Sequence, residues 1–230
     1  MDLSLERIAL AAVPVILAIT LHEASHGYVA KLFGDRTAEM LGRVTLNPLK
    51  HIDPVGTILV PGLLILTAKL GGPQFVFGWA KPVPVNFGNL RDPKRDMLWV
   101  AAAGPAANFA MAFFWMLIYR LSSPDGALAS DGMLLMSRAG VLVNVVLMVL
   151  NLLPIPPLDG GRIAVGVLPD ALAARFARLE PYGMLILIGL LFILPMLGAQ
   201  LGVDLNIVSQ VIASSTDSVI RTILRLTGNT

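Results

Sequence analysis

The sequence predicts an all-α, multi-pass membrane protein with about four full transmembrane helices. We further expect a re-entrant segment, a small β-hairpin or sheet, and an amphipathic C-terminal helix. Hydrophobic residues make up 56% of the 230 residues and charged residues only 14%, which is more apolar surface than a soluble domain of this length can bury. Uncharged runs that are long enough to cross a bilayer also recur along the chain.

Four runs can each cross the bilayer as a helix. Residues 97–119, 139–158 and 181–203 carry no charge. Residues 8–30 are apolar as far as Leu21 and then contain His22, Glu23 and His26, the only acidic, basic or histidine side chains within the four runs. Such side chains are costly in a membrane helix, so they indicate a functional site.

Two other regions are less regular. Residues 54–68 are apolar but interrupted by Pro61-Gly62, so a full crossing and a re-entrant segment remain alternatives. Residues 43–46 and 75–87 contain β-branched and aromatic residues, which predict short strands or a hairpin near the polar residues of the first run. Residues 205–226 repeat apolar side chains at helical spacing, and this amphipathic helix could lie on the membrane, on a partner or on its own bundle.

His22, Glu23 and His26 match the pattern HExxH. Residues four apart share one face of a helix, so both imidazoles can reach one metal ion while Glu23 reaches the water on it. The chain has no cysteine, so a metal must use nitrogen and oxygen ligands. The pattern predicts a zinc hydrolase centre in which Glu23 is the catalytic base.

A catalytic zinc ion usually has three protein ligands, so a third ligand is needed. Val29 and Leu32 stand where a metzincin would have Gly and His, and Glu39 lies in a turn-rich loop. Asp159 is the better candidate, because it follows an uncharged run in a stretch of prolines and glycines. Such irregular backbone is tolerated at membrane depth where it lines a cavity. The alternative for Asp159 is a helix cap or a turn.

Four stretches together resemble the site-2 protease family of intramembrane metalloproteases, in its compact form without PDZ or CBS modules. They are the HExxH helix, residues 47–56 (Asn-Pro-x-x-His-x-Asp-Pro-x-Gly), residues 104–108 (Gly-Pro-x-x-Asn) and residues 151–161, which include Leu-Asp-Gly-Gly. This resemblance covers roughly residues 15–165. It implies His22, His26 and Asp159 as ligands of one Zn²⁺ per chain, Glu23 as the base, and a transmembrane segment of another protein as the substrate.

Three more polar residues are candidates for contacts with the substrate or with a developing oxyanion. Asn108 and Asn151 are amides inside apolar runs, and interhelical hydrogen bonds are the alternative role for both. The resemblance favours function for these two, whereas Asn144 is expected to be structural. His51 either lies near the metal or the substrate, or is a turn residue beside Asp53.

The metal site also predicts the topology. His26 lies in the C-terminal half of its helix and Asp159 at the C-terminal end of another, so both ends must face the same side of the membrane. Residues 31–95 must then begin and end on that side, which favours the re-entrant alternative. If residues 54–68 re-enter, twelve Lys and Arg lie on the site's side of the membrane and five on the other. If residues 54–68 cross the membrane once, the same residues divide nine to eight. The excess predicts a cytoplasmic site and an external N-terminus.

We therefore expect one integral-membrane metalloprotease domain at residues 1–230, in the cell membrane, with a catalytic core at about 5–165 and C-terminal helices at about 181–228. The expected partners are the lipid bilayer and the substrate's transmembrane segment, and a homo-oligomer is left open. Nucleic acid is not expected, because the net charge is +2 without a dense basic run. A transporter would not explain the HExxH spacing, and a catalytically silent zinc-binding scaffold would not need Glu23.

Overall fold

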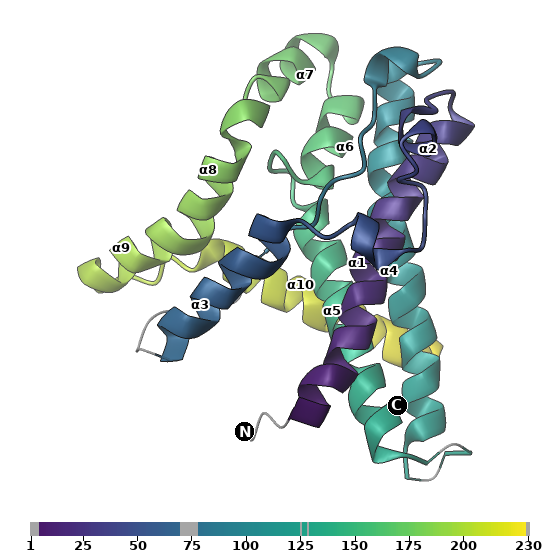
Figure 1. The fold of residues 1–230 in the computed structure, drawn as a ribbon. Helices are drawn as coiled ribbons and strands as arrows, with labels where there is room; N and C mark the ends of the chain where they lie inside the picture. Colours follow the sequence, from purple (N-terminus) through teal and green to yellow (C-terminus); the bar gives the residue numbers. More distant parts are fainter. Residues whose placement is uncertain (1–4, 70–77, 125, 128, 229–230) are drawn as a thin grey trace.

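The computed structural model describes residues 5–69, 78–124, 126–127 and 129–228, and three long helices stand side by side in it (Figure 1). The helices of the described residues are α1 (Leu5–Leu32), α2 (Thr37–Met40), α3 (Val60–Lys69), α4 (Pro93–Ser122), α5 (Asp131–Leu152), α6 (Asp159–Val167), α7 (Asp170–Ala177), α8 (Gly183–Ile188), α9 (Leu194–Leu201) and α10 (Ile207–Leu226). Short 3₁₀ or π-helical turns lie at Pro48–Lys50, Pro54–Leu59, Phe87–Asn89, Glu180–Tyr182 and Gly189–Ile193.

Four helical segments of the described chain are long and apolar enough to cross a membrane. They are Ala9–Leu32, Pro93–Ser122, Asp131–Leu152 and Asp170–Leu201, the last of which joins α7, α8 and α9. Each overlaps one of the runs predicted from the sequence, so that prediction is confirmed. α4 starts where such a helix should, because Pro93 occupies the first turn and the Asp92 side chain accepts a hydrogen bond from the Arg95 N–H.

α4 lies at the centre of the bundle and packs against α1, α5 and α6. Its contact with α5 is close because Gly140 of α5 lies against the ring of Trp115, where a Cβ would not fit. α10 crosses this bundle steeply (Figure 1) and buries Ile223 against α4 and α5. Asp217 and Arg221 on its other face are exposed. The predicted amphipathic helix therefore docks on its own bundle.

The predicted β-hairpin or sheet is wrong for the described residues, none of which lies in a strand. Residues 44–46 form bends, residues 78–86 have no regular secondary structure, and residues 75–77 of the predicted hairpin lie outside the described chain. Hydrogen bonding explains the difference. Pro82 and Pro84 have no N–H to give to a ladder. The N–H groups of Trp79 and Lys81 instead donate to carbonyls of the loop before α3.

The chain between α1 and α4 leaves and returns at the same end of the bundle, and α3 slants away from the long helices (Figure 1). The apolar stretch that was predicted to re-enter is helical, as a π-helical turn at Pro54–Leu59 followed by α3.

At the end of the bundle where α1 ends, the buried Asp35 side chain accepts hydrogen bonds from Thr37, Asn86 and Asn89. Burial opposes its ionisation, but these hydrogen bonds outweigh burial and lower the pKa of Asp35. Asp35 thus ties the chain just before α4 to the chain that follows α1.

Candidate metal centre

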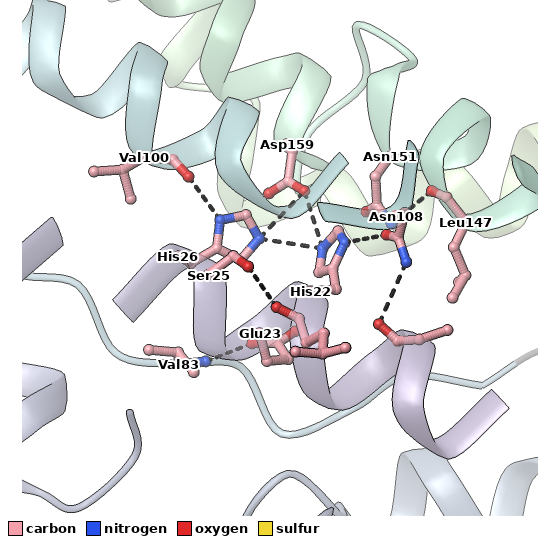
Figure 2. Close-up of polar contacts among 12 residues, drawn as sticks. His22, Glu23, Ser25, His26, Val83, Val100, Asn108, Leu147, Asn151 and Asp159 are labelled. Atoms are coloured by element: carbon pink, nitrogen blue, oxygen red, sulfur yellow. Dashed lines mark hydrogen bonds and ion pairs between the residues drawn. The ribbon is translucent and has the colours of Figure 1, made fainter. Parts of the chain in front are cut away.

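His22 and His26 lie one turn apart on α1, and both point toward Asp159 (Figure 2). Their Nε2 atoms are 3.1 Å apart, and the two rings meet edge to face at a centroid distance of 4.7 Å. Both side chains are buried. The HExxH spacing therefore places both imidazoles on one face of α1, within the bundle that α1 forms with α4 and α5.

Asp159 is the first residue of α6 and completes this cluster. Its Oδ2 atom lies 3.2 Å from Nε2 of His22 and 3.4 Å from Nε2 of His26. The next residue, Gly160, packs so closely on the carbonyls of Leu152 and Leu153 that a Cβ would not fit. The turn between α5 and α6 thus folds back tightly, which brings Asp159 to α1.

The hydrogen bonds of the two imidazoles determine which nitrogen carries the proton. Nδ1 of His26 lies 2.7 Å from the Val100 carbonyl, which can only accept, so this nitrogen donates its N–H. Nδ1 of His22 lies 2.6 Å from Oδ1 of Asn108. The Asn108 amide nitrogen donates to the Ala18 carbonyl and to Oδ1 of Asn144, so its oxygen is the acceptor for His22. In the neutral form both histidines therefore present an Nε2 lone pair to Asp159.

The donor set fits a metal ion. Nε2 of His22, Nε2 of His26 and a carboxylate oxygen of Asp159 all lie within 4.8 Å of one another. Oδ2 of Asp159 is buried and has no hydrogen-bond donor among the described residues. Three acceptors that converge without a proton between them repel one another unless a cation joins them. Two imidazoles and one carboxylate are the ligands of many catalytic zinc sites.

Glu23 lies beside these residues, and its Oε2 atom accepts a hydrogen bond of 2.8 Å from the Val83 N–H (Figure 2). Glu23 and the three candidate ligands line one cavity of about 250 Å³. The rest of its wall is mostly apolar, and it includes Trp79, Val83, Phe87, Met97, Asn151 and Met184. The cavity therefore offers space for an apolar substrate group next to the candidate base.

The three other predicted residues occupy different places. Asn151 lines the cavity, and its amide nitrogen donates to the Leu147 carbonyl (Figure 2). Asn108 is completely buried and does not line the cavity, because it bonds to His22 instead. His51 is also buried away from the cavity, and its Nε2 lies 3.0 Å from the Thr45 carbonyl. Only Asn151 is therefore placed to contact a substrate directly.

Comparisons with known proteins agree with the resemblance seen in the sequence. Residues 118–196, which include Asp159, match peptidase family M50. "Putative zinc metalloprotease YwhC" of Bacillus subtilis (strain 168) is 39% identical over 188 residues, which cover 80% of this chain and 80% of that protein. The chain belongs to the site-2 protease family, peptidase family M50. This membership and its four apolar helices make the chain an integral-membrane peptidase.

Two mycobacterial proteins are also similar to this site-2 protease. "Putative zinc metalloprotease Rip2" of Mycolicibacterium smegmatis is 33% identical over 178 residues, or 76% of this chain and 64% of that protein. The protein of the same name from Mycobacterium tuberculosis (strain H37Rv) is 30% identical over 146 residues, or 63% of this chain and 52% of that protein. No solved structure matches the site-2 protease significantly.

Sequence reasoning missed several groups that support the centre of this site-2 protease. The Val100 carbonyl and the Val83 N–H belong to the backbone, so no pattern of side chains in the sequence indicates them. Gly104, in the Gly-Pro-x-x-Asn stretch, faces the two imidazoles directly. Asn144, expected to be structural, holds the amide of Asn108. The Gly-Pro-x-x-Asn stretch at residues 104–108 was the one available signal, since it places Gly104 and Asn108 on one face of α4.

Proposed function

We propose that this site-2 protease is a zinc endopeptidase that hydrolyses a peptide bond within or near a transmembrane segment of another membrane protein. The convergence of two Nε2 lone pairs and the Asp159 carboxylate beside Glu23, on helices long enough to span a membrane, carries this proposal. The names of the similar proteins support zinc as the metal. One such centre among the described residues supports one zinc ion per chain.

Zinc held by His22, His26 and Asp159 would polarise the scissile carbonyl and lower the pKa of water to near neutrality. Glu23 would take the proton of the attacking water and later give it to the departing amine. The Val83 N–H donates to one carboxylate oxygen of Glu23 and would orient the carboxylate for these transfers. Asn151, in the cavity wall, is the candidate for a contact with the substrate backbone.

A helical substrate hides its carbonyls in hydrogen bonds, so the cleaved segment must be extended at the centre. The segment of residues 78–86, which is neither helix nor strand, runs along the cavity and contributes five of its lining residues. Ala80 lines the cavity, and its backbone N–H and carbonyl have no hydrogen-bond partner within the described chain. An extended substrate would pair with these two groups, as peptides pair with an exposed strand edge.

Replacing Glu23 by Gln tests the proposed function. We expect the variant to keep its zinc and to lose cleavage by about a hundredfold or more, because the amide cannot accept the proton of the water. The measurement compares the membrane proteomes of cells that carry wild-type or Glu23→Gln protein, together with zinc content per chain. A fragment that appears only with the wild type identifies the substrate. Equal fragments in both strains would refute the protease function. A zinc-binding scaffold would keep its function in the Glu23→Gln variant. A transporter would show no proteolysis in either strain.

We also propose that the centre lies nearer the cytoplasmic side of the cell membrane and that the N-terminus is external. The excess of Lys and Arg on the site's side supports this orientation. α1 ends and α4 begins at the same end of the bundle, as this count of Lys and Arg assumes (Figure 1). A reporter fused at residue 1 should be active only outside the cytoplasm, with a fusion to the 123–130 loop as a matched external control. A cytoplasmic signal from the residue 1 fusion would contradict this orientation.

A further inference from the structure

Arg43 is buried in a loop that is otherwise partly or fully exposed from residue 41 to residue 46. Only 9% of its surface is accessible, whereas Leu41 and Leu46 on either side are 61% and 68% exposed. A buried guanidinium is costly unless its N–H groups find acceptors. One terminal nitrogen of Arg43 lies 2.9 Å from the Lys81 carbonyl and 3.3 Å from the Pro82 carbonyl. This nitrogen links Arg43 to the segment that lines the cavity, while the buried Nε of Arg43 has no hydrogen-bond partner among the described residues.

The loop between α2 and α3 holds the same edge of this segment at further points. The Trp79 N–H donates to the Gly56 carbonyl at 3.0 Å, and the Lys81 N–H donates to the His51 carbonyl at 2.9 Å. Thr57 donates its hydroxyl to the Trp79 carbonyl at 2.9 Å. Successive bonds from every second residue keep the segment extended and leave Ala80 facing the cavity.

The far end of the segment reaches the candidate base. The Pro82 carbonyl, which Arg43 holds, and the Val83 N–H, which donates to Glu23, belong to the same peptide unit. A trans peptide is planar, with its oxygen and hydrogen on opposite edges, so fixing the oxygen also fixes the direction of the N–H. A cation on the carbonyl also polarises the peptide and strengthens its N–H as a donor.

We propose that Arg43 is a positioning residue for catalysis, which orients the Pro82–Val83 peptide so that the Val83 N–H holds the Glu23 carboxylate at the metal centre. Glu23 is the base only under the proposed function, so this role of Arg43 rests on that function. Arg43 itself does not line the cavity. It acts on the reaction through one peptide unit and not through contact with substrate.

Replacing Arg43 by Gln tests the role of the guanidinium. We expect kcat for a cleaved transmembrane substrate to fall by about tenfold to a hundredfold, since small misplacements of catalytic groups have effects of this size. KM should stay close to that of the wild type, because the lost contact serves the transition state. Zinc content per chain should stay unchanged. Arg43→Lys, which keeps the charge and can still reach a carbonyl, should recover part of the lost kcat.

Arg36→Gln is the matched control, because Arg36 lies in the same region but is exposed, and its side chain pairs with Glu39 at the surface. Its kcat should equal that of the wild type. Hydrogen–deuterium exchange on the zinc-free protein gives a readout independent of activity. In Arg43→Gln the amides of Trp79, Lys81 and Val83 should exchange faster, while those of α5 should not change. Unchanged exchange or an unchanged kcat would refute the role of Arg43.

A double-mutant cycle separates positioning from general stability. Val83→Pro removes the N–H that Glu23 accepts, so Arg43→Gln should cost little further kcat in that background. If Arg43→Gln lowers kcat by the same factor with and without Val83→Pro, Arg43 does not act through this N–H, and the inference is overturned. Glu23→Gln in the same assay distinguishes the two levels of failure. If the Glu23→Gln variant still cleaves the substrate, the proposed function is wrong. If Glu23→Gln is inactive and Arg43→Gln is fully active, only the role of Arg43 is refuted.

Discussion

Replacing Gly104 by Ala should strongly weaken both zinc binding and proteolysis. A Cβ at this position would lie 2.5 Å from Nε2 of His26 and 2.6 Å from Cε1 of His22, closer than real Cβ contacts come. Neither ring can retreat, because their Nδ1 atoms are bonded to Val100 and Asn108. We expect zinc affinity to fall by about a hundredfold, the upper range for lost ligand orientation, and cleavage to fall at least as far.

Zinc affinity by competition with a chelator and cleavage of a transmembrane substrate are the two measurements. Gly189→Ala is the matched control, since it also adds a methyl group to a glycine of an apolar helical segment. A Cβ at Gly189 would meet nothing within 4 Å. This control should bind zinc and cleave like the wild type. A Gly104→Ala protein that binds zinc normally would show that the imidazoles do not lie against α4 as they do in this fold.

The candidate ligands could be named from the sequence because their signals are local and chemical. His22 and His26 follow from spacing on one helix, and Asp159 from a carboxylate placed where prolines and glycines break an apolar run. What holds them could not be named in the same way. The Val100 carbonyl is 74 residues from His26 along the chain, and its position depends on how α4 packs against α1. Backbone acceptors become visible only once the helices are assembled.

The hairpin prediction failed for a physical reason that the sequence already contained. β-Branched and aromatic residues describe the surface of a strand, but a ladder also needs N–H groups at regular intervals. Pro82 and Pro84 remove two of them. The polar residues of the 47–56 stretch provide other partners. Asn47 accepts from the Leu49 N–H and Asp53 from the N–H groups of the turn after it, so this irregular backbone is satisfied without a sheet.

Replacing Asn108 by Leu should weaken zinc binding more than it weakens the fold. The variant removes the acceptor of the His22 Nδ1–H, so the ring can rotate or shift its proton to Nε2, which then cannot bind a metal. We expect zinc affinity to fall by roughly tenfold to a hundredfold. The buried partner Asn144 also loses its donor, which should lower the free energy of unfolding by about 1–3 kcal/mol.

Asn144→Leu separates these two effects, because the hydrogen bonds of Asn144 go to Asn108 and to the Gly140 carbonyl and not to a histidine. It removes the acceptor of one Asn108 N–H, while the bond from Asn108 to the Ala18 carbonyl still orients the amide toward His22. Thermal unfolding should therefore show a similar loss of stability in both variants, but chelator competition should show near-normal zinc affinity only in Asn144→Leu. An equal loss of zinc in the two variants would mean that helix packing, and not the hydrogen bond to His22, sets the geometry of the centre. The Asn108 amide would then be a link between helices, the alternative that its position in an apolar run left open.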